Sequence, residues 1–121
     1  MAHAAMLPAE SAPQIPAIDR AHLNEMTFGD RALERELLEL FDRQSALLMT
    51  RMRVAPPAVL AALAHTLKGS AMGIGAKAVA HAAASAEKAA AGSDAAQAAA
   101  LATLSAAIAA ARDEIAVLLA G

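Results

Sequence analysis

The sequence predicts an all-α protein, an antiparallel four-helix bundle with a short leading helix at its N-terminus. Alanine, the best helix former and a poor strand former, supplies much of the 58% hydrophobic content. Apolar residues recur at steps of three and four along most of the chain. Glycine, proline and aspartate separate these stretches, and short breaks between long helices favour antiparallel neighbours.

The chain of 121 residues fits a single domain. Residues 1–18 contain three prolines among small residues and are expected to form a flexible lead-in, whereas residues 19–121 are expected to form the bundle. Asp19 is the predicted N-cap of the leading helix, and Gly29 ends that helix. Asp30 is then placed to cap the next one.

The next helix is predicted over about 31–53, and its apolar face should consist of Leu33, Leu37, Leu40, Phe41, Leu48 and Met52. Pro56 stops it, and Pro57 suits the first turn of a helix over 57–72. Gly73 and Gly75 are expected to form a tight turn around Ile74.

A further helix is predicted from this turn to Ala91, with a seam of small side chains at Val79, Ala83, Ala86 and Ala90. The segment Gly92, Ser93 and Asp94 ends it and caps the last helix. The last helix has the most regular seam, formed by Leu101, Leu104, Ile108, Ala111, Ile115 and Leu118.

Composition excludes several function classes. The net charge is −2, and the two phenylalanines are the only aromatic residues, so nucleic-acid binding by a basic patch or by base stacking is not expected. Without cysteine, the chain has no disulfide and no thiolate metal site, and no metal site is expected from its histidines. No signal peptide or membrane span is recognised. We expect a cytoplasmic monomer.

His65 is the first candidate for chemistry. On a helical wheel of residues 57–74, the face opposite His65 carries Val59, Leu60, Leu63, Leu67 and Ile74, and this face should be the core. The side of His65 carries Ala58, Ala61, Ala62, Lys68, Gly69 and Met72. His65 is therefore predicted to face solvent.

Two neighbours of His65 indicate a site. Gly69 lies one turn after His65 and costs about 1 kcal/mol relative to alanine in a helix interior. A glycine there thins the surface beside the imidazole, so that another molecule can approach. Lys68 lies on the same side and can neutralise an anion held at the ring. Ala61, Ala62 and Met72 are candidates for a docking patch around the histidine.

These residues resemble the signature of histidine phosphotransfer (HPt) domains, His-x-x-Lys-Gly with a second glycine six residues on. Here the signature corresponds to His65, Lys68, Gly69 and Gly75. The resemblance covers about residues 19–121, in which Val79 stands where leucine is usual and Gly73 makes the turn unusually rich in glycine.

The resemblance implies a phosphoryl carrier of a two-component phosphorelay. A receiver domain bearing a phosphoaspartate would dock over His65, and the imidazole would attack phosphorus in line. The receiver would supply the Mg²⁺, so the chain needs no cofactor of its own. Glu87 occupies a position where the family commonly has a Gln or Glu that contacts the active histidine. It would accept the Nδ1–H bond and leave Nε2 free.

The implied partners are receiver domains of response regulators and a hybrid or sensor histidine kinase. The chain lacks the glycine-rich boxes and the length of an ATP-binding domain, so no kinase activity of its own is expected, and a free-standing carrier fits better than a chemotaxis kinase. An adaptor that docks on receivers without carrying phosphate, and a purely structural bundle, remain alternatives. Lys77, His81 and Lys88 share one side of their helix and are interpreted as a solvated face.

Overall fold

The computed structural model describes residues 16–121, and within them the chain is helical apart from short connections. The helices are α2 (Arg20–Met26), α3 (Arg31–Met52), α4 (Pro57–Ile74), α5 (Lys77–Ala89) and α6 (Asp94–Ala120). Most of the predicted flexible lead-in, residues 1–15, lies outside the described residues. The structure confirms the all-α fold class.

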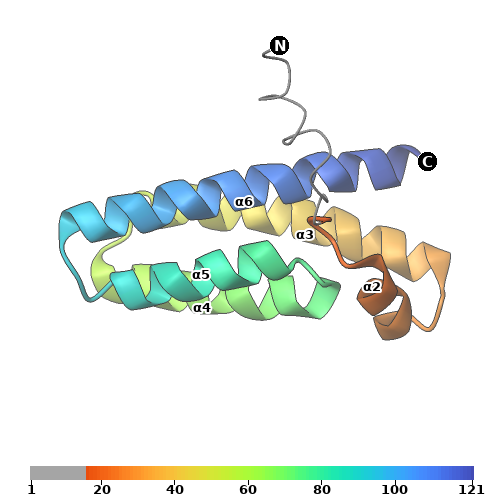
Figure 1. Cartoon of the computed structure of the whole chain (residues 1–121), viewed down its shortest axis with the longest axis horizontal. Coiled ribbons are helices and arrows are strands. Elements are labelled where there is room, and N and C mark those ends of the chain that lie inside the picture. The colour runs from red at the N-terminus through yellow and green to blue at the C-terminus, as the bar shows by residue number, and fades with distance from the viewer. Residues whose placement is uncertain (1–15) are drawn as a thin grey trace, which may run out of the picture.

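The four long helices form an antiparallel bundle, and α2 lies across one end of it (Figure 1). Each long helix packs against two others, in the order α3, α4, α5, α6 and back to α3. The contact between α4 and α5 is the most extensive of these. It brings α5 next to the side of α4 that carries His65. None of the helices in residues 16–121 is both long enough and apolar enough to cross a membrane.

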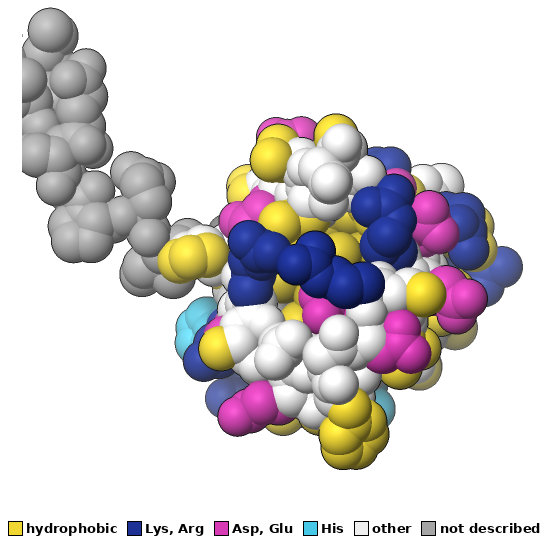
Figure 2. Space-filling model, turned by 90° about the vertical axis from the view of Figure 1, so that its right-hand side faces the viewer, with side chains coloured by type: hydrophobic (Ala, Val, Ile, Leu, Met, Phe, Trp, Pro, Cys, Tyr) yellow, Lys and Arg dark blue, Asp and Glu magenta, His cyan; other side chains and the backbone are white. Residues whose placement is uncertain are grey.

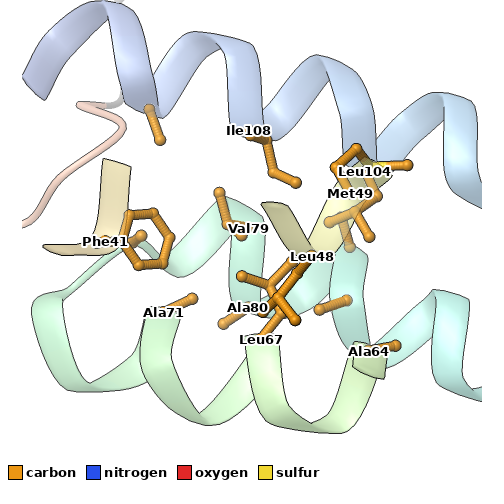
Figure 3. Close-up of a cluster of buried hydrophobic side chains, with 14 of the residues drawn as sticks. Phe41, Leu48, Met49, Ala64, Leu67, Ala71, Val79, Ala80, Leu104 and Ile108 are labelled. Carbon is orange, nitrogen blue, oxygen red and sulfur yellow. The ribbon is translucent and has the colours of Figure 1, made fainter. Parts of the chain in front are cut away.

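All four long helices contribute to the core, in which larger side chains such as Phe41, Leu67 and Ile108 meet small side chains of α5 (Figure 3). All four members of the small seam on α5 are buried, and so are the central members of the α6 seam, Leu104, Ile108, Ala111 and Ile115. Small side chains let α5 approach its neighbours closely, since packing at native density leaves no room for larger ones.

Two residues predicted for the core are exposed. Leu40 on α3 is 53% exposed and Val59 on α4 is 46% exposed. Their places are taken by Leu38 and Met49 on α3, and by Ala64 and Ala71 on α4. A wheel shows which residues share a face, but the positions of the neighbouring helices decide how wide the buried face is.

The predicted caps of the first helices are confirmed. The Asp19 side chain accepts a bond from the His22 N–H at 3.1 Å, and the Asp30 side chain accepts one from the Leu33 N–H at 3.1 Å. The Ser93 hydroxyl does the same for the Ala96 N–H at 3.1 Å. These bonds satisfy N–H groups that lack an intrahelical partner.

The end of α4 differs from its predicted position. Gly73 lies within the helix, which continues to Ile74, so the turn begins two residues later than predicted. Gly75 is the left-handed cap, with φ of 81°, and its carbonyl accepts a 2.8 Å bond from the Asp19 N–H. A Cβ at Gly75 would lie 2.9 Å from the Asp19 carbonyl oxygen. Gly75 is therefore required both by its backbone conformation and by the close crossing of the chain before α2.

Two residues before α2 are part of the packed structure. Ile18 is fully buried, and the Glu114 carboxylate on α6 accepts bonds from the Ala17 N–H at 2.9 Å and the Ile18 N–H at 3.2 Å. These contacts attach the segment before α2 to α6, and no pattern in the sequence predicts them.

The end of the bundle beside α2 carries a hollow whose charged lining consists of three arginines and Glu34. Figure 2 shows Lys and Arg side chains gathered there around hydrophobic atoms. Arg20, Arg31 and Arg35 line this hollow with Leu23, Leu38 and Leu118. Arg35 donates to the Leu119 carbonyl at 2.8 Å, which caps the C-terminal turn of α6. Neither α4 nor α5 contributes to this hollow.

Candidate functional site

His65 lies in the middle of α4, on the side opposite the core. Leu60 and Leu67 on the same helix are buried, whereas 66% of the His65 side-chain surface is exposed. The prediction that His65 faces solvent is confirmed. The imidazole can therefore be reached by another molecule without any opening of the bundle.

The Glu87 carboxylate on α5 lies against one nitrogen of the imidazole. His65 Nδ1 is 3.1 Å from Glu87 Oε2 and 3.3 Å from Oε1, so the ring N–H donates to the carboxylate. The predicted contact between these side chains is confirmed. The contact arises because α4 and α5 form a hairpin, and His65 and Glu87 each lie eleven residues from Ala76 in its turn.

Lys68 completes a group of three side chains. Its Nζ is 3.4 Å from Glu87 Oε1, so the same carboxylate contacts both the ammonium group and the imidazole. About a third of the Lys68 side chain is exposed. A short rotation of this flexible side chain moves the ammonium group towards an anion at the ring.

Gly69 leaves the surface beside His65 bare. A Cβ built at Gly69 would have nothing within 4 Å, and the same holds for Gly73 one turn further on. Both positions therefore face outward, and glycine is not required there by the packing of the free protein. The sequence prediction that Gly69 faces outward is confirmed.

The family comparison agrees with this geometry. The model of the Hpt domain family matches residues 31–114, which is more than half of the chain and covers α3, α4, α5 and most of α6. The chain belongs to the Hpt domain family. Searches of the curated proteins and of the solved structures gave no significant match. Hpt domains are helical bundles that act in histidine phosphotransfer within phosphorelays, as carriers rather than kinases.

The Hpt match places His65, Lys68, Gly69 and Glu87 within the family region. Of the three residues predicted for docking, Ala62 and Met72 are exposed, and Met72 exposes 60% of its surface. Ala61 is half-buried and packs against the core.

A groove beside the site was missed by the sequence analysis. Lys77 and His81, which were interpreted as a solvated face, line a groove of about 460 Å³ together with Lys68 and Met72. Lys88 lies outside this groove. His22 on α2 also lines it, and nothing in the local sequence places α2 beside α5. The sequence signal for this groove is the spacing of Lys77 and His81, which lie one helical turn apart.

Proposed function

We propose that this Hpt domain accepts a phosphoryl group on His65 from the phosphoaspartate of a receiver domain and passes it to a second receiver. The observation that carries the proposal is the bond between His65 Nδ1 and Glu87 on an otherwise exposed imidazole. This bond places the proton on Nδ1, and Nε2 has no partner among residues 16–121. Nε2 therefore keeps its lone pair for attack on phosphorus.

The transfer exchanges one bond to phosphorus for another. The Nε2 lone pair of His65 forms the N–P bond, the bond from phosphorus to the aspartate oxygen breaks, and the aspartate leaves as a carboxylate. The ring retains its Nδ1 proton and becomes positively charged as the N–P bond forms. Glu87 stabilises this charge from behind the ring, where it does not repel the incoming phosphoryl group. The receiver is expected to supply the Mg²⁺.

Lys68 and Gly69 support the same step. The Lys68 ammonium group, which contacts the same carboxylate as His65, would screen the phosphoryl oxygens once they reach the ring. Gly69 keeps the approach over α4 free of side-chain bulk. Ala62 and Met72 border this approach and are proposed to contact the docked receiver, with Ala61 at its inner edge.

The proposal is tested by incubating the chain with a panel of receiver domains phosphorylated by acetyl phosphate and Mg²⁺. We expect an acid-labile, alkali-stable label on the wild-type chain and no label on His65→Ala or His65→Gln. The helical circular dichroism of both variants should match wild type, because an exposed side chain contributes little to stability. Label on His65→Ala would refute the acceptor assignment.

A second arm separates the carrier from the alternatives. Radioactive ATP without an added kinase should leave the chain unlabelled. A chain that binds receivers but never takes label would be the docking adaptor. A chain that does neither would be a structural bundle.

A further inference from the structure

The turn between α2 and α3 holds a strained residue. Phe28 has φ of 54°, and it is the only residue other than glycine with a positive φ in residues 16–121. The Gly29 N–H bonds to the Asn24 carbonyl at 2.9 Å and the Phe28 N–H to the Glu25 carbonyl at 3.3 Å, the pattern of a Schellman motif. Its left-handed position is usually glycine, because a Cβ crowds the backbone there.

Phe28 gains no burial that could offset this strain. Its surface is 95% exposed, whereas Phe41, the other aromatic residue, is 2% exposed. For the stability of the free bundle, glycine or asparagine would serve better at this position. An exposed aromatic side chain held on a strained turn is typical of a residue that contacts another molecule.

Between His65 and this turn, α4 presents two glycines and one side of an apolar groove. Gly69 and Gly73 follow His65 at intervals of one turn, and neither presents a side chain. Gly73 and Met26 line one apolar groove of about 260 Å³, together with Leu37, Leu40, Phe41, Gln44, Ser70 and Ile74. Met26 is 51% exposed and lies two residues before Phe28.

The dimensions allow one partner to cover all of this surface. Gly73 lies eight residues after His65, which corresponds to about 12 Å of helix. A typical interface covers about 800 Å² on each partner. A domain that docks over His65 with a contact of this size can reach along the two glycines to Met26, which lies two residues before Phe28.

We propose that Phe28 is an anchor residue for the receiver domain that exchanges phosphate with His65. Its ring enters an apolar recess on the receiver, and Met26 packs beside it at the rim of the groove. This inference rests on the proposed function, and it adds the residue that contributes most to docking without touching the reacting atoms. Burial of the ring against the partner then offsets the strain of its backbone.

The test compares Phe28→Asn with Val54→Asn. Asparagine tolerates the left-handed conformation, so Phe28→Asn relieves strain without opening a cavity. Val54 is 84% exposed and lies in the connection between α3 and α4, at the opposite end of α3, so it controls for the same change in polarity. The measurements are the KM and the saturating rate of transfer from the receiver that labels wild type fastest, together with the melting temperature.

For Phe28→Asn we expect the KM to rise about tenfold or more, with the saturating rate within about twofold of wild type. The melting temperature should stay the same or rise. Val54→Asn should match wild type in all three measurements. An unchanged KM for Phe28→Asn would overturn the proposal, and a lowered melting temperature with unchanged KM would assign Phe28 to the stability of the turn.

A binding arm keeps this inference distinguishable from the proposed function. The affinity of the same receiver is measured by calorimetry for Phe28→Asn in the wild-type and the His65→Ala backgrounds, each compared with its parent. A Phe28-dependent affinity in both backgrounds supports the anchor, even if the chain proves to be an adaptor that takes no label. If wild type is a dimer and Phe28→Asn is a monomer with unchanged receiver affinity, the partner of Phe28 is a second copy of this chain. That result would overturn the proposal.

Discussion

The hydrogen bond between His65 and Glu87 should contribute measurably to the rate of phosphoryl transfer. Glu87→Ala removes the acceptor of the Nδ1–H and the negative charge behind the ring, and it should leave the bundle intact because neither side chain is buried. A hydrogen bond to a charged group contributes about 1.5 to 3 kcal/mol. Because 33% of the Glu87 side chain and 66% of the His65 side chain are exposed, solvent screens this bond, and we place its contribution at about 1 to 2 kcal/mol. Transfer should therefore slow about 5- to 30-fold.

Glu87→Gln is the matched control, because its amide oxygen still accepts the Nδ1–H while the charge and the ion pair with Lys68 are lost. We expect a rate within about threefold of wild type. Rapid-quench transfer from a phosphorylated receiver gives the rates, and ¹⁵N chemical shifts of the His65 ring give the tautomer. Glu87→Ala should also lose the preference for the Nδ1–H tautomer. A wild-type rate for Glu87→Ala, or equal losses for both variants, would refute the argument that the bond itself matters.

Leu67→Ala should lower the free energy of unfolding by about 2 to 5 kcal/mol in urea titrations, because Leu67 is fully buried; a loss below about 1 kcal/mol would contradict its place in the core. Gly69→Leu should block transfer while the free energy of unfolding rises by up to about 1 kcal/mol, since this position is open and leucine is the better helix former; unchanged transfer rates would show that the receiver does not cover this turn. The pKa of the Asp19 carboxyl lies below its ordinary value of 3.8, first because the His22 N–H bonds to it and then because of Lys77. The charged form thus stabilises the fold above about pH 4, and this stabilisation is lost as the pH falls through the lowered pKa. Asp19→Asn should reduce the loss of melting temperature between pH 5 and pH 2 relative to wild type, and an identical pH profile would disprove the linkage.

Much of the site follows from local spacing. The wheel of α4 places His65 opposite Leu60 and Leu67 because 3.6 residues complete each helical turn, whatever the rest of the bundle does. The contact with Glu87 follows almost as directly, since an antiparallel hairpin brings together residues at equal distances from its turn.

Other features depend on which elements lie beside one another. Leu40 and Val59 have the apolar character of core residues but stay exposed, and Leu40 lines a groove beside Met26 and Gly73. The groove of Lys77, His81 and His22 forms because α2 crosses the end of α4 beside α5. The strain at Phe28 is equally invisible in the sequence, where Gly29 is the expected residue for the left-handed position.

The sequence by itself determined the fold class, the main helices, the exposure of His65 and the side chains around it, because each depends on periodicity and on residues close along the chain. The requirement for glycine at position 75, the second glycine of the signature, depends on the tertiary structure. The Asp19 carbonyl oxygen lies where a Cβ of residue 75 would be, and two segments more than fifty residues apart meet there only after the bundle has formed.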